Sequence, residues 1–293
     1  MEHVLTDGEL SVTLSTTGGS LTSIKAAGRE YLWQADPRVW SGQAPICFPI
    51  CGGLREGRAE TTDGSRIELS RHGFTRGREF ALVDARDAMA AMRLTSTPEL
   101  LSQYPFPFEF VARYTLGRVA GALDVSYEIT NVGERDMPFF VGGHPAFRCP
   151  LSCEEDFTDY LIRFDEPEVE TVPRAEVDTG LIDVSDRSEG PQRGRDLPLS
   201  HELFAVSETI YDRLASRGAT LLSRRGTHGV RLTFPDMPYL IVWSKPAGDF
   251  VAIEPWGGLS TCSDEDDIFE HKRGCLIARP GETVTRGFTI EVF

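Results

Sequence analysis

The chain has 293 residues, and 30 Lys and Arg residues against 45 Asp and Glu residues give it a net charge of −15. Such an acidic chain lacks the basic surface by which proteins bind nucleic acids or anionic membranes, so we expect neither partner. A composition of 40% apolar and 26% charged residues is typical of a globular protein with a sizeable core. The N-terminus lacks the features of a signal peptide, and no apolar run is long enough for a membrane helix, so the sequence predicts a cytoplasmic protein.

Alternating apolar and polar residues, which are typical of β-strands with one buried face, form the main pattern along the chain. The clearest case is residues 123–129, where apolar and polar side chains alternate without a break. Similar runs predict further strands at residues 10–14, 21–24, 110–116, 239–243, 250–254 and 283–293. Turn-forming residues separate these runs. Residues 1–293 are therefore predicted to form one all-β domain.

Helices are predicted to be few and short. Thr97 and Pro98 are residue types that begin helices, and this helix must end before Tyr104, which precedes a proline. Residues 200–203 predict a second brief helical turn. Residues 151–199 are rich in Asp, Glu, Arg and Pro, and we expect them to form long loops with one or two strands.

Two pairs of cysteines, Cys47 with Cys51 and Cys149 with Cys153, have a spacing that differs from the CxxC of zinc knuckles. We expect them to be reduced thiols buried among apolar residues; zinc held by the second pair and a nearby histidine is the alternative. The acidic run 264–267 lacks the ligand spacing of an EF-hand and predicts a solvated loop. No metal is therefore expected.

His72 lies in a glycine-containing stretch with three arginines, Arg71, Arg76 and Arg78. In so acidic a protein, this positive cluster would attract a polar or anionic ligand. Phe74 indicates that one wall of such a site is apolar. The alternative is a solvated loop with no ligand.

His144 follows two glycines, Gly142 and Gly143, at the end of an apolar run. The glycines remove side-chain bulk at a point where another group could approach the backbone. A functional histidine and a histidine that is hydrogen-bonded in a turn before Pro145 are both compatible with this pattern.

Glu254 follows four apolar residues and precedes Pro255 and Trp256. A carboxyl group in this setting is expected to be buried, and burial raises the pKa of a carboxyl group as general bases require. Trp256 would provide an apolar platform for the C–H face of a sugar. The alternative is a structural glutamate paired with an arginine.

Three stretches, RHGFTR, GGHPAF and AIEPWGG, occur in this order and resemble the aldose 1-epimerase (galactose mutarotase-like) family, above all its bacterial LacX-like branch. The stretches EYLWQADPRVWSGQAPICFPICGGL, YPFPFEFVARYTL and EHKRGCLIARPGE also match, so the resemblance covers nearly the whole chain. It implies a large single-domain antiparallel β-sandwich, with a sugar site in a cleft on one sheet.

The resemblance also implies roles for individual residues. Glu254 matches the family's catalytic base, and His144 matches its catalytic acid. His72 matches a second histidine, which hydrogen-bonds the sugar. Arg71 and Arg76 lie where basic groups would bind the substrate.

Two positions depart from the family pattern. Many mutarotases carry a sugar-binding arginine near the position of Gly53, and here Arg55 follows two residues later. A sugar-binding aspartate of the family is best matched by Ser207, with Glu208 adjacent. Galactose or glucose therefore cannot be assumed as the substrate.

The resemblance implies an aldose 1-epimerase that interconverts the α and β anomers of a small sugar by acid–base ring opening and reclosure, without a cofactor. A hexose-6-phosphate epimerase is one alternative, because the arginines beside His72 could bind a phosphate. A non-catalytic carbohydrate-binding protein of the same fold is another, because of the two departures. The sequence leaves the oligomeric state open.

Overall fold

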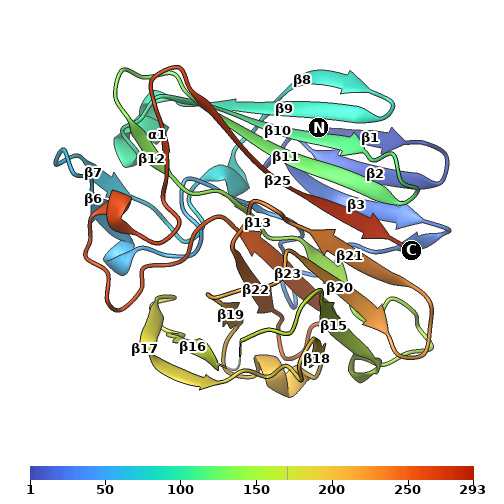
Figure 1. Cartoon of the computed structure of the whole chain (residues 1–293). Coiled ribbons are helices and arrows are strands. Elements are labelled where there is room, and N and C mark those ends of the chain that lie inside the picture. Colours follow the sequence, from blue (N-terminus) through green and yellow to red (C-terminus); the bar gives the residue numbers. More distant parts are fainter. Residues whose placement is uncertain (170) are drawn as a thin grey trace.

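The computed structural model describes residues 1–169 and 171–293. Strands make up 47% of the structure and helices 8%, which confirms the prediction of an all-β protein with few short helices. The strands form two main antiparallel sheets with smaller sheets and hairpins around them (Figure 1). None of the helices among the described residues has both the length and the apolar character that crossing a bilayer demands.

The two main sheets are named here the large sheet and the β23 sheet. Across the large sheet the order is β18 (Asp196–Pro198), β15 (Tyr160–Phe164), β20 (Gly218–Ser223), β21 (Gly229–Thr233), β25 (Thr283–Val292), β11 (Ala122–Asn131), β10 (Phe108–Leu116), β9 (Met89–Thr95) and β8 (Ala81–Arg86). Across the β23 sheet the order is β19 (Thr209–Tyr211), β22 (Tyr239–Trp243), β23 (Phe250–Trp256), β13 (Gly142–Gly143) and β5 (Ile46–Cys47), and β14 (Ala146–Arg148) also pairs with β23.

Smaller elements surround these sheets. An N-terminal sheet contains β1 (Glu2–Thr6), β2 (Leu10–Ser15), β3 (Ser20–Ala26) and β4 (Arg29–Glu30). The further pairs are β6 (Arg58–Glu60) with β7 (Arg66–Glu68), β12 (Met137–Phe139) with β24 (Leu276–Ala278), and β16 (Thr171–Ala175) with β17 (Ile182–Glu189). The α-helix is α1 (Pro98–Gln103), and short 3₁₀-helices lie at Arg55–Gly57, Thr75–Gly77, Phe157–Asp159, His201–Phe204 and Phe269–His271.

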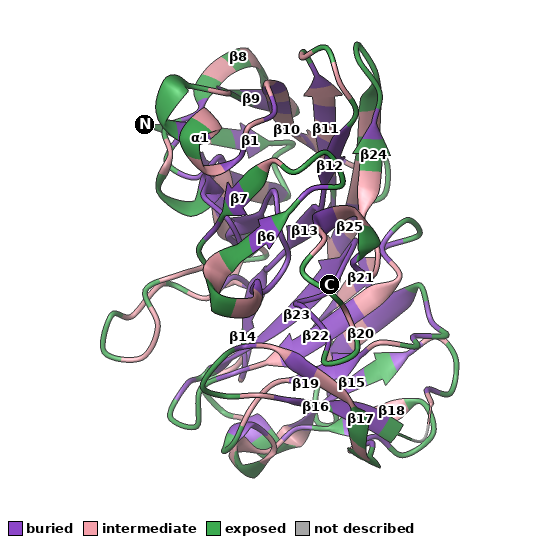
Figure 2. Cartoon of the chain, turned by 90° about the vertical axis from the view of Figure 1, so that its left-hand side faces the viewer, coloured by how far each residue is buried: buried purple, intermediate pink, exposed green. Residues whose placement is uncertain are grey.

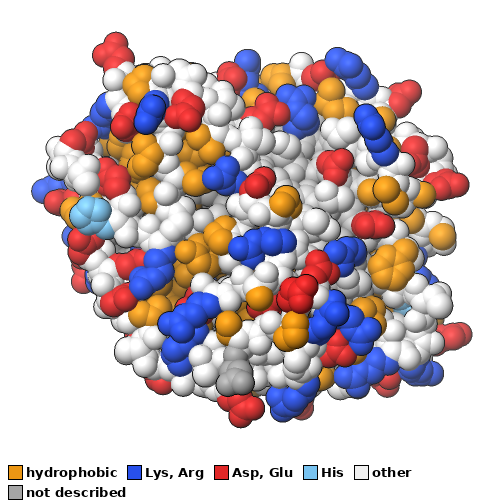
Figure 3. Space-filling view, viewed as in Figure 1, with side chains coloured by type: hydrophobic (Ala, Val, Ile, Leu, Met, Phe, Trp, Pro, Cys, Tyr) orange, Lys and Arg blue, Asp and Glu red, His pale blue; other side chains and the backbone are white. Residues whose placement is uncertain are grey.

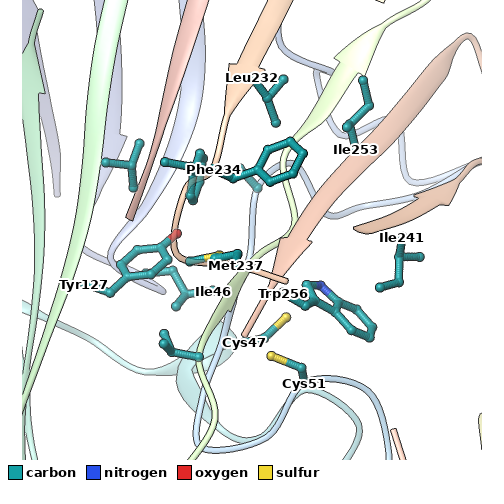
Figure 4. Packing of buried hydrophobic residues seen from close by; sticks show 14 of the residues in the cluster. Ile46, Cys47, Cys51, Tyr127, Leu232, Phe234, Met237, Ile241, Ile253 and Trp256 are labelled. Atoms are coloured by element: carbon teal, nitrogen blue, oxygen red, sulfur yellow. The ribbon is translucent and has the colours of Figure 1, made fainter. Parts of the chain in front are cut away.

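The large sheet and the β23 sheet pack face to face, as in a sandwich. Residues of β10 alternate between buried and half-buried, so that Phe108 and Phe110 point into the space between the sheets. The ring of Phe48, which follows β5, lies 5.0 Å from each of these two rings. Figure 4 shows the same core further along, with Tyr127 from the large sheet opposite Ile46 from the β23 sheet. The predicted sandwich fold is thereby confirmed.

Both predicted helical turns are confirmed. The side chain of Thr97 accepts a hydrogen bond from the backbone N–H of Leu100, and the helix ends at Gln103. Ser200 caps the 3₁₀-helix that follows it in the same way.

The prediction of one or two strands within residues 151–199 is wrong, because the described part of this segment contains four, β15 to β18. Strand β17 is built mainly from polar residues and half of its residues are exposed, whereas β16 buries Val172, Pro173 and Ala175. A strand that buries little apolar surface has no apolar alternation in its sequence, so the pattern could not reveal it.

The cysteine prediction is confirmed for Cys47, Cys51 and Cys149, which are buried free thiols. It is wrong for Cys153, which lies in an exposed turn between β14 and the next 3₁₀-helix. Among the residues that the structure describes, no group of three or more His, Cys, Asp or Glu side chains is placed to hold a metal ion.

The acidic run 264–267 forms a loop, as predicted, but its carboxylates are paired with basic side chains. Arg273 binds both Asp264 and Glu265, and the buried Nζ of Lys272 lies 3.1 Å from Glu265. On the face of the molecule that Figure 3 shows, Lys and Arg side chains are likewise scattered among Asp and Glu side chains.

Candidate active site

Strand β23 places Glu254 on the outer face of the β23 sheet. Along this strand, Val251 and Ile253 belong to the main core between the sheets, whereas Ala252 belongs to a separate small cluster on the other face. Glu254 lies on the same face as Ala252, because side chains alternate along a strand. Every residue of β23 is nevertheless buried, so loops and neighbouring side chains cover this face too (Figure 2).

The pairing of β13 and β14 with β23 places His144 beside Glu254. Gly142 lies opposite Trp256 in one pair, and Ala146 lies opposite Ala252 in the other. The antiparallel register between these pairs sets position 144 opposite position 254. The strand pairing therefore brings together two residues that are 110 positions apart.

Gly142 and Gly143 allow this part of the backbone to pack closely against the protein itself. A Cβ atom on Gly142 would lie 2.8 Å from Cδ1 of Trp256, and one on Gly143 would lie 2.6 Å from Cε1 of Phe288. An aromatic side chain of the protein therefore packs against each glycine. By allowing this close packing, the glycines fix the backbone that carries His144.

Gly143→Ala should destabilise the protein by about 1–3 kcal/mol, because the new methyl group overlaps the buried ring of Phe288. Urea unfolding of the variant measures this loss. Gly77→Ala is the matched control, since a Cβ there meets no atom within 4 Å. Equal unfolding free energies for the two variants would contradict the packing described above.

Glu254 and His144 form a buried acid–base pair. Oε2 of Glu254 lies 3.2 Å from Nε2 of His144, and their side chains are 2% and 7% exposed. Burial raises the pKa of Glu254 well above 4.5, and Cys47 and Glu208 raise it further. Burial also lowers the pKa of His144 to about 3, and the positive charge of Arg76 contributes. Each group therefore favours its neutral form.

His72 lies next to this pair and is held in one orientation. Its ring centre is 5.4 Å from that of His144 and 5.4 Å from that of Trp256. Its Nδ1 accepts a hydrogen bond of 3.1 Å from the backbone N–H of Gly52. Burial lowers the pKa of His72 well below 6.5, and the charges of His144 and Arg71 lower it further, so the ring is neutral.

These residues line a cavity of about 480 Å³ on the outer face of the β23 sheet. All the site residues that the sequence predicts lie on its wall: Arg71, His72, Arg76, His144, Ser207, Glu254 and Trp256. The structure thus brings together side chains from four distant parts of the chain. Their individual roles stay predictions.

The arginines beside His72 separate into two groups. Arg71 and Arg76 line the cavity, and Nη2 of Arg71 lies 2.8 Å from Oε1 of Glu208, which also lines it. Arg78 instead pairs with Glu99 and is absent from the cavity wall. The positive cluster that the sequence predicts is therefore smaller than expected, and one of its two members is neutralised.

Comparison with known proteins shows the family of the chain. The model of a family described as aldose 1-epimerase matches residues 1–290. The chain belongs to the aldose 1-epimerase family. It is 40% identical over 290 residues to two LacX proteins of Lactococcus lactis subsp. lactis, one plasmid-borne and one chromosomal, and each alignment covers 97% of this chain and 96% of the relative.

Solved structures of galactose mutarotase-like proteins have the same fold. A galactose mutarotase related enzyme from Lactobacillus acidophilus has a TM-score of 0.91 at 27% identity, with 100% of this chain and 97% of that chain covered. A galactose mutarotase-like protein from Lactobacillus casei has a TM-score of 0.91 at 26% identity, with both chains fully covered.

Side chains from other positions partly replace the two groups that are missing from the aldose 1-epimerase pattern. Arg55 does not replace the missing arginine, because its side chain binds Asp267 away from the cavity. Arg71 brings a guanidinium group to the cavity from a different segment. Beside Ser207, Glu208 brings a carboxylate, so an arginine and a carboxylate both remain on the wall.

Two tryptophans that the sequence analysis missed also line the cavity. Trp40 stacks on the ring of His144 with centres 5.2 Å apart, and it contacts Trp243 edge-on at 5.1 Å. Both are half-buried, whereas Trp256 is only 3% exposed, so Trp40 and Trp243 offer the larger apolar surface to a ligand. Trp243 could have been found from the sequence by pairing its predicted strand with that of Glu254, because this pairing sets Trp243 opposite Ala252. Trp40 could not, because it lies in an irregular segment with no sequence pattern.

Proposed function

We propose that the protein is an aldose 1-epimerase that interconverts the α and β anomers of a free aldose. The observation that carries this proposal is the 3.2 Å separation of Glu254 and His144 on the wall of the cavity. In a cyclic sugar the ring oxygen and the anomeric hydroxyl are bonded to the same carbon. An acid and a base this close together can therefore serve both oxygens at once.

Ring opening needs one base and one acid. We assign the base to Glu254, which takes the proton of the anomeric hydroxyl, and the acid to His144, whose Nε2–H donates to the ring oxygen. The bond between the anomeric carbon and the ring oxygen breaks and an aldehyde forms. Rotation about the adjacent carbon–carbon bond exposes the other face, and the two proton transfers then run in reverse as the ring closes.

The pKa shifts of the pair favour this direction of proton transfer. A carboxylate whose pKa is raised is a stronger base, and an imidazolium whose pKa is lowered is a stronger acid. Ring opening converts the charged pair of Glu254 and His144 into the neutral pair, and burial favours the neutral pair. Binding of the sugar must first stabilise the charged pair, and their 3.2 Å contact helps to do so.

Polarimetry tests the proposal. The α-anomers of a panel of sugars are dissolved, and relaxation to equilibrium is followed with and without the protein. We expect faster relaxation for at least one sugar, in proportion to protein concentration. A protein that binds a sugar by calorimetry but leaves every relaxation at the buffer rate would instead be a carbohydrate-binding protein.

We expect Glu208→Gln to raise KM for the sugar about tenfold, because a charged hydrogen-bond partner is lost from the cavity wall. Glu208 raises the pKa of Glu254, so its removal lowers that pKa. The fall of kcat/KM at high pH should then occur at lower pH. The reason is that Glu254 and His144 share one proton in the active state and would lose it at a lower pH.

The control for this variant is Glu99→Gln, which breaks an ion pair of the same 2.8 Å length outside the cavity. It should leave both KM and the pH profile unchanged. Equal effects of the two substitutions would show that Glu208 acts only through general stability or net charge.

A second candidate is a related enzyme that acts on a phosphorylated hexose. Arg76 and Lys245 line the cavity, and neither forms an ion pair with any residue that the structure describes. These two cations could bind a phosphate. A hexose 6-phosphate would then raise the melting temperature more than the free hexose does, and equal shifts would exclude this candidate. The cytoplasmic location also stays a prediction from the sequence.

A further inference from the structure

The tautomer of His72 follows from the hydrogen bond to its Nδ1. The donor of this bond is the backbone N–H of Gly52, at 3.1 Å. A backbone amide can only donate, so Nδ1 must be an acceptor that carries no proton. In the neutral ring the proton is then on Nε2.

A thiol reaches the same nitrogen. Sγ of Cys47 lies 3.3 Å from Nδ1 of His72, and both residues are buried. Because Nδ1 is an acceptor, the thiol must be the donor in this contact. Burial raises the pKa of Cys47 well above its usual value, which keeps the proton on the sulfur.

A second thiol lies beside the first. Figure 4 shows the sulfur of Cys51 near that of Cys47 beside Trp256, and Cys51 helps to raise the pKa of Cys47. The single S–H of Cys47 is directed at His72.

The backbone holds the two segments in place. His72 has a left-handed φ of 67°, which is unfavourable for a residue with a side chain. Its N–H donates to the carbonyl of Gly52 over 2.7 Å, and its carbonyl accepts from the N–H of Phe48 over 3.2 Å. At Gly73 a Cβ would lie 2.0 Å from the carbonyl oxygen of Phe48, so only glycine allows the two segments to approach this closely.

We propose that Cys47 is a positioning residue, a thiol donor that acts with the N–H of Gly52 to hold the tautomer and orientation of His72. The ring then presents Nε2–H to the cavity, as a donor for an oxygen of the ligand. Nε2 makes no hydrogen bond to any residue within the described part of the chain, and His72 lines the cavity. The identity of the ligand rests on the proposed function; the tautomer does not.

NMR of protein labelled with ¹⁵N-histidine tests this role of Cys47 without any sugar. The resonances of His72 are assigned by their loss in His72→Asn. In the wild type we expect a proton on Nε2 and a hydrogen-bonded, unprotonated Nδ1. Cys47→Ala should move the Nδ1 resonance to higher frequency, because an unprotonated nitrogen is deshielded when it loses a donor. Cys47→Ser should restore most of the wild-type value, because the hydroxyl group is also a donor.

The matched control is Cys149→Ala, which removes another buried thiol, one that makes no hydrogen bond to His72 among the described residues. It should lower stability while leaving the His72 resonances unchanged. Where a sugar is bound, Cys47→Ala should weaken its affinity about threefold, as expected for one neutral hydrogen bond.

Two results would overturn the proposal. One is a wild-type spectrum in which Nδ1 of His72 carries the proton. The other is an Nδ1 resonance that moves no further in Cys47→Ala than in Cys149→Ala. Both are independent of whether the protein anomerises any sugar, so they separate this proposal from the proposed function.

Discussion

Glu254→Gln is expected to reduce catalysed anomerisation by about 100- to 10,000-fold, the contribution typical of one positioned general base. Glutamine has nearly the shape of glutamate, and it cannot accept the proton of the anomeric hydroxyl. Because the side chain is 2% exposed, water has little access to take over that role. Initial rates from polarimetry measure the loss, and a variant with more than a tenth of the wild-type kcat/KM would contradict the role of Glu254 as the base.

The same variant should be more stable than the wild type at neutral pH. Folding raises the pKa of Glu254 above 4.5, so above pH 4.5 the native state holds a proton that the unfolded chain has lost. The free energy of unfolding therefore falls as pH rises from 4.5 to the native pKa, by about 1.4 kcal/mol per pH unit. Glutamine does not titrate, so the free energy of unfolding of the variant does not fall in this way as pH rises.

Denaturant unfolding at pH 5 and pH 8 tests this stability difference. The advantage of Glu254→Gln should be larger at pH 8. A variant that is less stable than the wild type at both pH values would mean that Glu254 is a structural residue, which is the alternative left open by the sequence.

His144→Gln should also reduce kcat/KM by about 100- to 10,000-fold, because the ring oxygen loses its acid. This substitution has a second effect with the opposite pH dependence. Folding lowers the pKa of His144 from 6.5 to about 3, so between these values the unfolded chain binds a proton that the native state excludes. Stability of the wild type is lost as pH falls through this range, by about 1.4 kcal/mol per pH unit from this residue alone.

Unfolding free energies measured from pH 6.5 to pH 4 check this effect. The curve for His144→Gln should be flatter than that of the wild type. His271→Gln is the control, because the side chain of His271, at the end of the 3₁₀-helix Phe269–His271, is 55% exposed. If His144→Gln and His271→Gln gave curves of equal slope, His144 could not be buried as described.

Much of the fold was predictable because strands with one buried face leave a two-residue period in the sequence. The clearest run, 123–129, lies within β11, and the run 250–254 lies within β23. Strand β17 was not predictable, because it is largely polar and half of its residues are exposed. A sequence pattern records burial of apolar side chains and does not record the hydrogen bonds that pair polar strands.

The candidate site was predictable at the residues where chemistry requires an unusual local context. Glu254 was recognisable because a carboxyl group at the end of an apolar strand must be buried. The partnership of Arg71 with Glu208 was not, because it joins segments 137 positions apart through the fold. The same holds for Cys47 and His72, whose contact depends on loops that dock through backbone hydrogen bonds.

The central claim, that this cavity opens and closes a sugar ring, is tested most directly by magnetisation-transfer NMR at chemical equilibrium. The α-anomeric proton of a sugar that binds is saturated, and the loss of intensity at the β-anomeric proton gives the exchange rate. We predict an exchange rate that rises in proportion to the concentration of wild-type protein and is unchanged from buffer with Glu254→Gln. An exchange rate that stays at the buffer value for every sugar that binds the wild type would contradict the claim.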